Sequence, residues 1–204
     1  MAAIAIQSNQ NDQHGGQSIP NFDYAMAEGV AKTYRKAFTR RLRDVVEDYL
    51  DLDDAGDEIT GVIAEAEAAT GETARLESSP AFTQAVADRL CGRYKMEDAV
   101  AKKLVDKAAR RSATKTDRDT KQAMEGFVHN LNTMHSRAGA QTPFSSINYG
   151  TDTSPEGRMV IRNILLALEA GLGHGETCIF PIHISRSKRA STIMRKTPTT
   201  TCSA

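Results

Sequence analysis

Residues Asn130–Ile184 read NLNTMHSRAGAQTPFSSINYGTDTSPEGRMVIRNILLALEAGLGHGETCIFPIHI, and this stretch determines the expected fold class. Phe144–Tyr149 alternates apolar with polar side chains, which is typical of a half-buried strand. Thr177–Ile184 is a second short and largely apolar run, and it predicts another strand. A helical pattern of about four turns separates the two runs. Strand, helix and strand in this order predict a βαβ unit within a larger α/β sheet or barrel.

The helix between the two strands has a start signal and a stop signal. Thr151–Ser154 offers side-chain oxygens to the first free amides, and Pro155 suits the first helical position. Thr153 and Glu156 have the spacing of a capping box. Gly171 can supply the left-handed residue that ends the helix. The apolar positions that form one wide face are Val160, Ile161, Ile164, Leu165, Leu168 and Leu172.

The chain up to residue 135 is predicted to be a helical block. Pro20–Leu50 predicts one long helix, and the polar run Asn9–Gln17 predicts a loop before it. The core stripe expected on the long helix is Phe22, Met26, Val30, Tyr34, Phe38, Leu42, Val45, Val46 and Tyr49. Its basic outer face is Lys32, Arg35, Lys36, Arg40, Arg41 and Arg43. Further helices are expected at Glu58–Ala69, after Ser78-Ser79-Pro80, at Glu97–Arg111 and at Thr116–Met134.

Composition excludes several functional classes. With 26 basic and 26 acidic residues among 204, the net charge is zero, so no bulk electrostatic attraction to DNA or to a membrane is expected. We find no export leader and no apolar run long enough to span a bilayer. The three cysteines form neither a CxxC pair nor an even disulfide framework, so a reducing cytoplasm is the expected location.

Several blocks of this sequence resemble one enzyme family. The blocks are His14–Pro20, His135–Gln141, Pro143–Gly150 with the following Thr-Asp-Thr-Ser, and Gly175-Glu-Thr with Ile179–Pro181 and Ile182. Together and in this order they resemble the anaerobic, class III ribonucleoside-triphosphate reductases, which are glycyl radical enzymes. The resemblance covers roughly residues 1–184 and marks the chain as an internal piece of a longer enzyme.

The resemblance implies a fold, a reaction and partners. The expected fold is a helix-rich α/β piece of the family's ten-stranded barrel, with helical block 1–135 followed by strand, helix and strand within 142–184. In the family, a glycyl radical generates a cysteine thiyl radical that initiates reduction of a ribonucleoside triphosphate, commonly with formate as reductant. Structural zinc, an effector ATP or dNTP, a homodimer and a radical-SAM activase also belong to the family. Helices near the basic face of Pro20–Leu50 contribute to the family's dimer and effector site.

Residues 185–204 differ in kind from the rest. They are basic, Thr-rich and without periodicity, which is typical of a disordered tail. Codons chosen for the residues from Ser185 onward and read one base earlier give Phe-Lys-Val-Lys-Glu-Gly-Val-Asn, which resembles the family's continuation. We therefore hypothesise a single-base frameshift at Ser185, so that residues 1–184 belong to the catalytic barrel domain and 185–204 are out of frame. An immediate stop codon in the other frame after Ile184 would disprove it.

The residues that carry the family's chemistry are not found in this sequence, so we assign no catalytic residue. No Arg-Val-Cys-Gly-Tyr-like motif occurs, and Cys91, Cys178 and Cys202 are not assigned the thiyl role. The histidines share no metal-binding spacing, and no metal ligand is assigned. Gly171–Gly175 follows a helix and precedes a strand, so a plain turn is favoured over a phosphate-binding loop.

Polar groups around the first strand are the candidate substrate ligands. The candidates are Gln141, Thr142, Ser145, Ser146 and Asn148, and strand alternation lets only half of them face one side. The amides of Thr153 to Glu156 are further candidates for binding phosphate. A purely structural role for these groups is equally consistent with the sequence.

Two functional hypotheses follow. The first is a piece of an anaerobic reductase, which we expect to be inactive by itself. The second is a non-catalytic nucleotide-binding or dimerisation module, which would bind nucleotide without turnover. A third hypothesis is a purely helical interaction protein.

Overall fold

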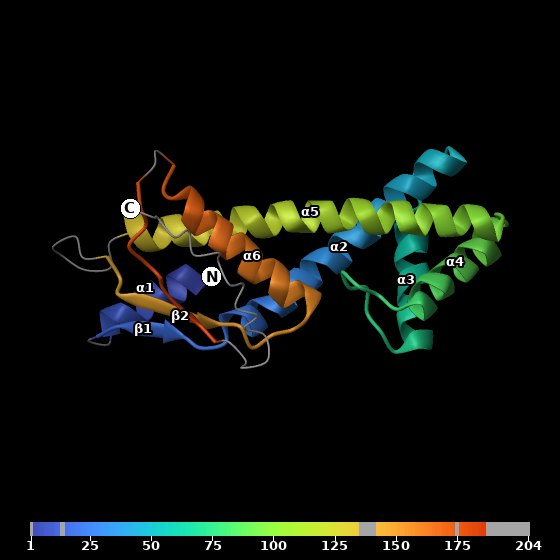
Figure 1. Cartoon of the computed structure of the whole chain (residues 1–204). Coiled ribbons are helices and arrows are strands. Elements are labelled where there is room, and N and C mark those ends of the chain that lie inside the picture. Colours follow the sequence, from blue (N-terminus) through green and yellow to red (C-terminus); the bar gives the residue numbers. More distant parts are fainter. Residues whose placement is uncertain (1, 13–14, 135–141, 174–175, 187–204) are drawn as a thin grey trace, which may run out of the picture.

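The computed structural model describes residues 2–12, 15–134, 142–173 and 176–186, which form a helix-rich α/β arrangement (Figure 1). The elements are α1 (Ala2–Asp12), β1 (Gln17–Ile19), α2 (Phe22–Leu50), α3 (Gly56–Thr70), α4 (Pro80–Tyr94), α5 (Asp98–Thr133), β2 (Ser145–Tyr149), α6 (Pro155–Ala170) and β3 (Ile182–Ser185). None of the helices within these ranges combines the length and the apolar character that crossing a bilayer requires.

The strands form one parallel sheet in the order β1-β2-β3. The predicted βαβ unit is confirmed, because β2, α6 and β3 follow one another and β2 pairs directly with β3. The prediction of a loop over Asn9–Gln17 is wrong at both ends. Helix α1 continues to Asp12, and Gln17 starts β1, which pairs with Ser145 of β2. Three residues are too few to show alternation, so β1 is identified only by its pairing.

Helix α2 matches the predicted long helix closely, with most of the expected stripe buried. Tyr49 is the exception, since it is 53% exposed and was predicted to be in the core. The C-terminal end of α2 extends past α5 in Figure 1, so its last turn has fewer neighbours to pack against.

Helix α5 is continuous over Asp98–Thr133, which corrects the prediction of two helices at Glu97–Arg111 and Thr116–Met134. The intervening residues contain neither Gly nor Pro. The Ser112 hydroxyl, which would otherwise compete with the helix, donates to the Ala108 carbonyl at 2.6 Å within the same helix. Ser112 is fully buried, so tertiary packing decides the conformation of this segment.

Two apolar cores share α2 and α5. The first lies among α2, α3, α4 and α5 and includes Leu42, Val62, Phe82, Leu90 and Val105. The second lies among α1, α2, α5, α6 and the sheet and includes Phe22, Phe127, Leu131, Ile147 and Ile164. Leu76, in the connection between α3 and α4, packs against both. The sheet and α6 are thereby joined to the helical block through shared helices.

Helix α6 buries most of the predicted face, since Ile161, Leu168 and Leu172 also pack against the second core. Val160 and Ile164 are fully buried, but Leu165 is 44% exposed, contrary to our prediction. Asn163 is buried in its place, and its side-chain amide donates to Asp117 of α5 at 2.9 Å. A polar contact between the two helices therefore replaces part of the expected apolar contact.

Candidate functional site

The two faces of the sheet have different characters. Ser145, Ile147 and Tyr149 are buried, whereas the intervening Ser146 and Asn148 are half-buried, as alternation along a strand requires. Ile147 belongs to the core shared with the helices, so the first three side chains lie on the helix-covered face. Ser146 and Asn148 consequently lie on the opposite face.

This opposite face, which we call the open face, continues onto the neighbouring strands. Ser146 is aligned with Ser18 of β1 and with Ile182 of β3, and Asn148 is aligned with Ile184. Residues paired across a parallel sheet point to the same side. Ile182 and Ile184 are 55% and 49% exposed, and Ser18 is also exposed. The open face thus combines polar groups on β1 and β2 with apolar groups on β3.

The predicted substrate ligands are only partly brought together. Ser146 and Asn148 share the open face, while Ser145 lies on the helix-covered face and is 3% exposed. Thr142 is half-buried in irregular backbone before β2, and Gln141 lies outside the described residues. The Asn148 side-chain oxygen is shielded from solvent and has no hydrogen-bond partner, as is also true of the Ser145 hydroxyl. Buried polar atoms are seldom left unpaired, so Asn148 is the strongest candidate on the open face.

A buried carboxylate that sequence analysis did not identify anchors the end of β2. Asp23, near the start of α2, is fully buried, and one of its oxygens accepts the amides of Gly150, Thr151 and Asp152, each at 2.9 Å. The Thr151 hydroxyl lies 3.3 Å from its other oxygen. The connection between β2 and α6 is thereby fixed to α2, more than 120 residues away in the chain.

The charge of Asp23 is stabilised in the fold. Burial raises the pKa of this carboxyl, but hydrogen bonds from the amides of Asp152, Gly150, Tyr24 and Thr151 outweigh burial, so the pKa lies below its ordinary value of 3.8. A lowered carboxyl pKa contributes stability that is present above the ordinary value and is lost as the pH falls through the folded-state pKa. The anchor therefore operates at neutral pH.

The start of α6 is capped by a relay rather than by the predicted capping box. Asp152 accepts the amide and the hydroxyl of Ser154, both at 2.8 Å, and the Ser154 hydroxyl accepts the amide of Gly157 at 3.0 Å. Ser154, not Thr153, is therefore the N-cap, with Pro155 at the first position as predicted. Glu156 is buried and accepts the Leu76 amide at 3.2 Å instead of closing a capping box.

This relay removes two of the groups from Thr153 to Glu156 that were expected to bind phosphate. The amide of Ser154 is already bonded to Asp152, and Pro155 has no N–H. Asp23 occupies the three preceding amides. The carboxylates of Asp23 and Asp152 therefore occupy much of this turn, and the side chains of the open face are the stronger candidate ligands.

A second anchor that sequence analysis missed is Asn132, near the end of α5. Its side-chain oxygen accepts the amides of Ile179 and Phe180 at 2.8 and 3.0 Å, and its side-chain nitrogen donates to the Phe180 carbonyl at 2.6 Å. These contacts replace strand pairing over Thr177–Pro181, so β3 begins only at Ile182. They position β3 beside β2.

His183, in β3, lies 5.8 Å from Tyr149 in an edge-to-face ring contact. Both its ring nitrogens are shielded from solvent and have no hydrogen-bond partner, and burial lowers its pKa below the ordinary value of 6.5. The unfolded chain then binds the proton more readily than the folded chain, so stability falls as the pH drops from 6.5 through the folded-state pKa.

We predict that His183→Phe abolishes this acid-dependent loss of stability, because phenylalanine keeps the ring contact and cannot be protonated. Urea unfolding midpoints measured from neutral pH to about pH 5 check this, over the range where histidine titrates. The exposed His129, changed to Gln, is the matched control and is expected to keep the wild-type pH dependence. An unchanged slope in His183→Phe would contradict the assignment.

Comparison with known proteins identifies the family of this chain. The family profile described as anaerobic ribonucleoside-triphosphate reductase matches residues 1–201. The chain belongs to this family. The resemblance found in the sequence is therefore confirmed. The profile match extends into 185–204, while residues 187–204 lie outside the described residues, so the frameshift hypothesis stays a prediction.

Two relatives carry the same name. The anaerobic ribonucleoside-triphosphate reductase of Enterobacteria phage T4 is 38% identical over 87 residues, covering 42% of this chain and 14% of the relative. The enzyme of the same name from Salmonella typhimurium is 35% identical over 69 residues, covering 33% of this chain and 10% of the relative. The chain therefore matches a small part of the length of these reductases.

The described residues include the cysteines Cys91 and Cys178 and the histidines His129 and His183. They contain no cluster of three His, Cys, Asp or Glu side chains placed to hold a metal ion. Cys91 packs against the first core, and the Cys178 thiol lies 3.6 Å from the Leu168 carbonyl, so each has a structural environment. Cys202 lies outside the described residues.

Proposed function

We propose that this chain forms part of the substrate-binding wall of an anaerobic reductase that converts ribonucleoside triphosphates to deoxyribonucleoside triphosphates. Family membership supports the reaction class. The observation that carries the assignment of the wall is the open face, where Ser146 and Asn148 lie together on the side away from the helices. The barrel remains our prediction for the longer enzyme.

The two side chains offer complementary groups to a ribose. Asn148 presents an amide with donors and an acceptor, and Ser146 presents a hydroxyl that can donate and accept. The Asn148 oxygen is shielded and unpaired, so a substrate hydroxyl would satisfy it. Asp23 and Asn132 act on these groups indirectly, by fixing the end of β2 and the start of β3. Such preorganisation lowers the entropy lost on binding.

The remaining parts of the reaction belong to the longer enzyme. In the family, the glycyl radical and the cysteine thiyl supply hydrogen-atom abstraction, with formate as the common reductant. We derive no step through these groups or through zinc. The sequence contains no Arg-Val-Cys-Gly-Tyr-like motif, and the described residues contain no cluster of three His, Cys, Asp or Glu side chains placed to hold a metal ion. A homodimer, a radical-SAM activase, an effector ATP or dNTP and a cytoplasmic location are proposed only for the full-length reductase.

The test compares CTP binding by variants on the two faces of β2. We expect Asn148→Ala to weaken CTP binding to the 204-residue chain by about tenfold, the loss expected when one well-formed polar contact is removed. Ser145→Ala is the matched control, since Ser145 lies on the same strand, faces the helices and has no hydrogen-bond partner. It should leave CTP affinity within about twofold. Isothermal titration calorimetry measures both.

Comparison with dCTP tests recognition of the ribose. Weaker binding of dCTP than of CTP in the wild type, with the difference reduced in Asn148→Ala, supports contact with the 2′ hydroxyl. Equal losses in Asn148→Ala and Ser145→Ala, or no CTP binding, would refute the assignment of the open face. We expect no turnover by the isolated chain.

A further inference from the structure

A cavity lies where α2, the connection between α3 and α4, and the start of α6 meet, an arrangement that Figure 1 shows. Its volume is about 290 Å³, close to the lower limit for pockets that bind small molecules. Tyr24, Ala27 and Ala31 line it from α2, Arg75 from the connection and Glu156 from α6. None of the lining residues belongs to the open face, so the cavity plays no part in the proposed function.

Glu156 places a buried negative charge in this cavity. The residue is 2% exposed, and one of its oxygens accepts the Leu76 amide at 3.2 Å. Within the described residues, no other hydrogen bond and no ion pair engages its carboxylate. The positive end of the α6 dipole offsets only about half of a unit charge. Buried carboxylates are normally paired with a full positive charge, so a cationic ligand would be stabilised here.

The other charged groups of the cavity do not neutralise Glu156. Arg75 is exposed and forms no ion pair in the part of the chain that the structure describes. Glu28 is already paired with Lys32 at 2.7 Å, and both oxygens of Asp152 accept hydrogen bonds from the N-cap of α6. The cavity therefore offers one buried anionic group and, at its exposed edge, one guanidinium.

The free oxygen of Glu156 and the walls of the cavity select the kind of cation. A guanidinium pairs best with two free carboxylate oxygens, but one oxygen of Glu156 already holds the Leu76 amide. A primary ammonium is a compact point charge that a single oxygen can bind. The described residues contain no cluster of three acidic, His or Cys side chains placed to hold a metal ion. Tyr24, Ala27 and Ala31 share one face of α2 and offer apolar surface to an aliphatic chain.

We propose that this cavity binds a small molecule that carries a primary ammonium group on an aliphatic chain, with the ammonium against Glu156. The source is either a diamine or a basic amino acid such as lysine. A diamine would place its second ammonium near Glu28, whereas the carboxylate of lysine would pair with Arg75. The proposal does not rest on the reductase reaction.

The probes are 1,4-diaminobutane and lysine, each titrated into the full 204-residue chain by isothermal titration calorimetry at about 150 mM salt, where weak surface attraction is screened. We expect saturable binding of at least one of them to one site in the wild type. Glu156→Gln removes the charge but keeps an oxygen for the Leu76 amide, and it should weaken this binding at least about tenfold. Since glutamine leaves no buried charge unpaired, the urea midpoint of this variant without ligand should not fall below that of the wild type.

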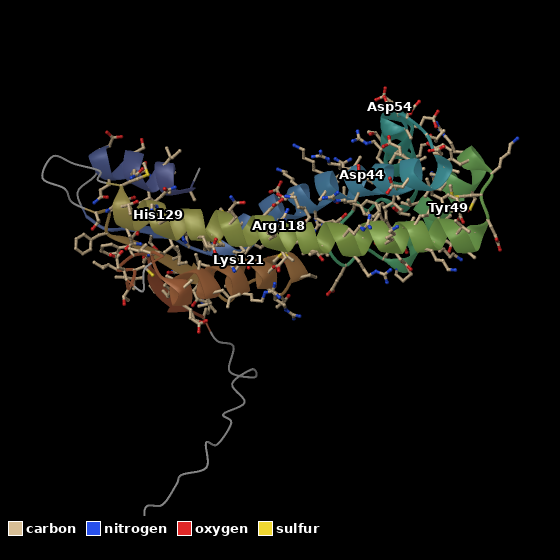
Figure 2. All side chains as sticks on the ribbon, turned by 90° about the horizontal axis from the view of Figure 1, so that it is seen from above. Asp44, Tyr49, Asp54, Arg118, Lys121 and His129 are labelled. Atoms are coloured by element: carbon tan, nitrogen blue, oxygen red, sulfur yellow. The ribbon has the colours of Figure 1, made fainter. Side chains whose placement is uncertain are left out.

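Asp54→Asn is the matched control for Glu156→Gln. Asp54 also accepts one backbone amide, that of Gly56 at 3.0 Å, and asparagine keeps this acceptor while removing the charge. Figure 2 shows Asp54 beyond the end of α2, away from α6. The control should retain affinity for both probes within about twofold. Circular dichroism verifies that each variant is folded.

The variant Arg75→Gln distinguishes the two sources. Binding of lysine that weakens at least about tenfold in Arg75→Gln, with diamine binding unchanged, assigns a basic amino acid. Tighter binding of the diamine than of lysine, with no loss in Arg75→Gln, assigns a diamine. No saturable binding of either probe, or equal weakening in Glu156→Gln and Asp54→Asn, would overturn the proposal. Mg²⁺ binding that competes with the probes and is lost in Glu156→Gln would also overturn it, in favour of a metal site.

Discussion

Replacing Asp23 with alanine is expected to lower the free energy of unfolding by about 3–5 kcal/mol, because several buried hydrogen bonds lose their acceptor together. The substitution leaves the amides of Gly150, Thr151 and Asp152 without their common acceptor. All three donors lie where β2 leads into α6, so the loss falls on the element that carries Asn148. Urea unfolding followed by circular dichroism at pH 7 measures it.

Glu28→Ala is the matched control for Asp23→Ala. Glu28 lies on the same helix and carries the same charge, but it is largely exposed and pairs only with Lys32. Exposed pairs one turn apart contribute little, so we expect no change in the free energy of unfolding beyond the error of the measurement. A loss of similar size in both variants would show that helix charge, and not the buried anchor, governs stability.

Gly150→Ala is expected to cost about 3 kcal/mol or more, because two penalties act together. The φ angle of Gly150 is +100°, a conformation that L residues rarely adopt. An added Cβ would lie 2.4 Å from the carbonyl oxygen of Arg186, which is backbone and cannot rotate away. The end of β2 and the end of β3 must therefore separate. Urea unfolding measures the loss, and hydrogen exchange in β3 locates it.

Gly29→Ala makes the same chemical change in the opposite context. Gly29 lies within α2, and an added Cβ meets no atom within 4 Å. Alanine is the better helix former, so we expect this variant to be more stable by about 0.5–1 kcal/mol. Destabilisation by Gly29→Ala, or tolerance of Gly150→Ala, would contradict this account of the two glycines.

The elements predicted well from the sequence are those specified by local chemistry. Helix α2 was located from its apolar stripe, and α4 from Ser79 and Pro80, where the Ser79 hydroxyl accepts the Phe82 amide at 3.1 Å. The same kind of signal located the start of α6 at Pro155 and its end at Gly171, although Ser154 is the N-cap and Gly171, with φ 69° and ψ −154°, is not in the predicted left-handed helical conformation. Caps and periodicity act within a few residues, so a single sequence reveals them.

The features that were not predicted from the sequence depend on contacts with residues far away in the chain. β1 has three residues and is a strand only because Ser145–Ile147 lies beside it. Asp23 has the sequence context of an ordinary acidic residue in the first turn of a helix, and its role arises from amides more than 120 residues away. Asn132 is likewise identified only by its contacts with Ile179 and Phe180. No local pattern distinguishes these residues from their exposed counterparts.

The candidate site also combines features that a local pattern predicts with features that depend on distant contacts. Alternation along β2 predicts that Ser146 and Asn148 share one face and that Ser145 lies on the other. Which of these faces the helices cover follows only from the core around Ile147 and from the register with β3. The fold separates these strand residues onto two faces, and their role in binding substrate stays a prediction.

The pairing of Gln17 with Ser145 encloses nearly the whole helical block within one parallel crossover. Contacts among α3, α4 and α5 close short loops of the chain. Pairing of β1 with β2 instead closes a loop of more than 120 residues, which costs more chain entropy. On a ribosome, the helical block is complete before β2 emerges, and β1 has no partner until then. We therefore expect the helices to fold early and the sheet, with the candidate site on it, to assemble last.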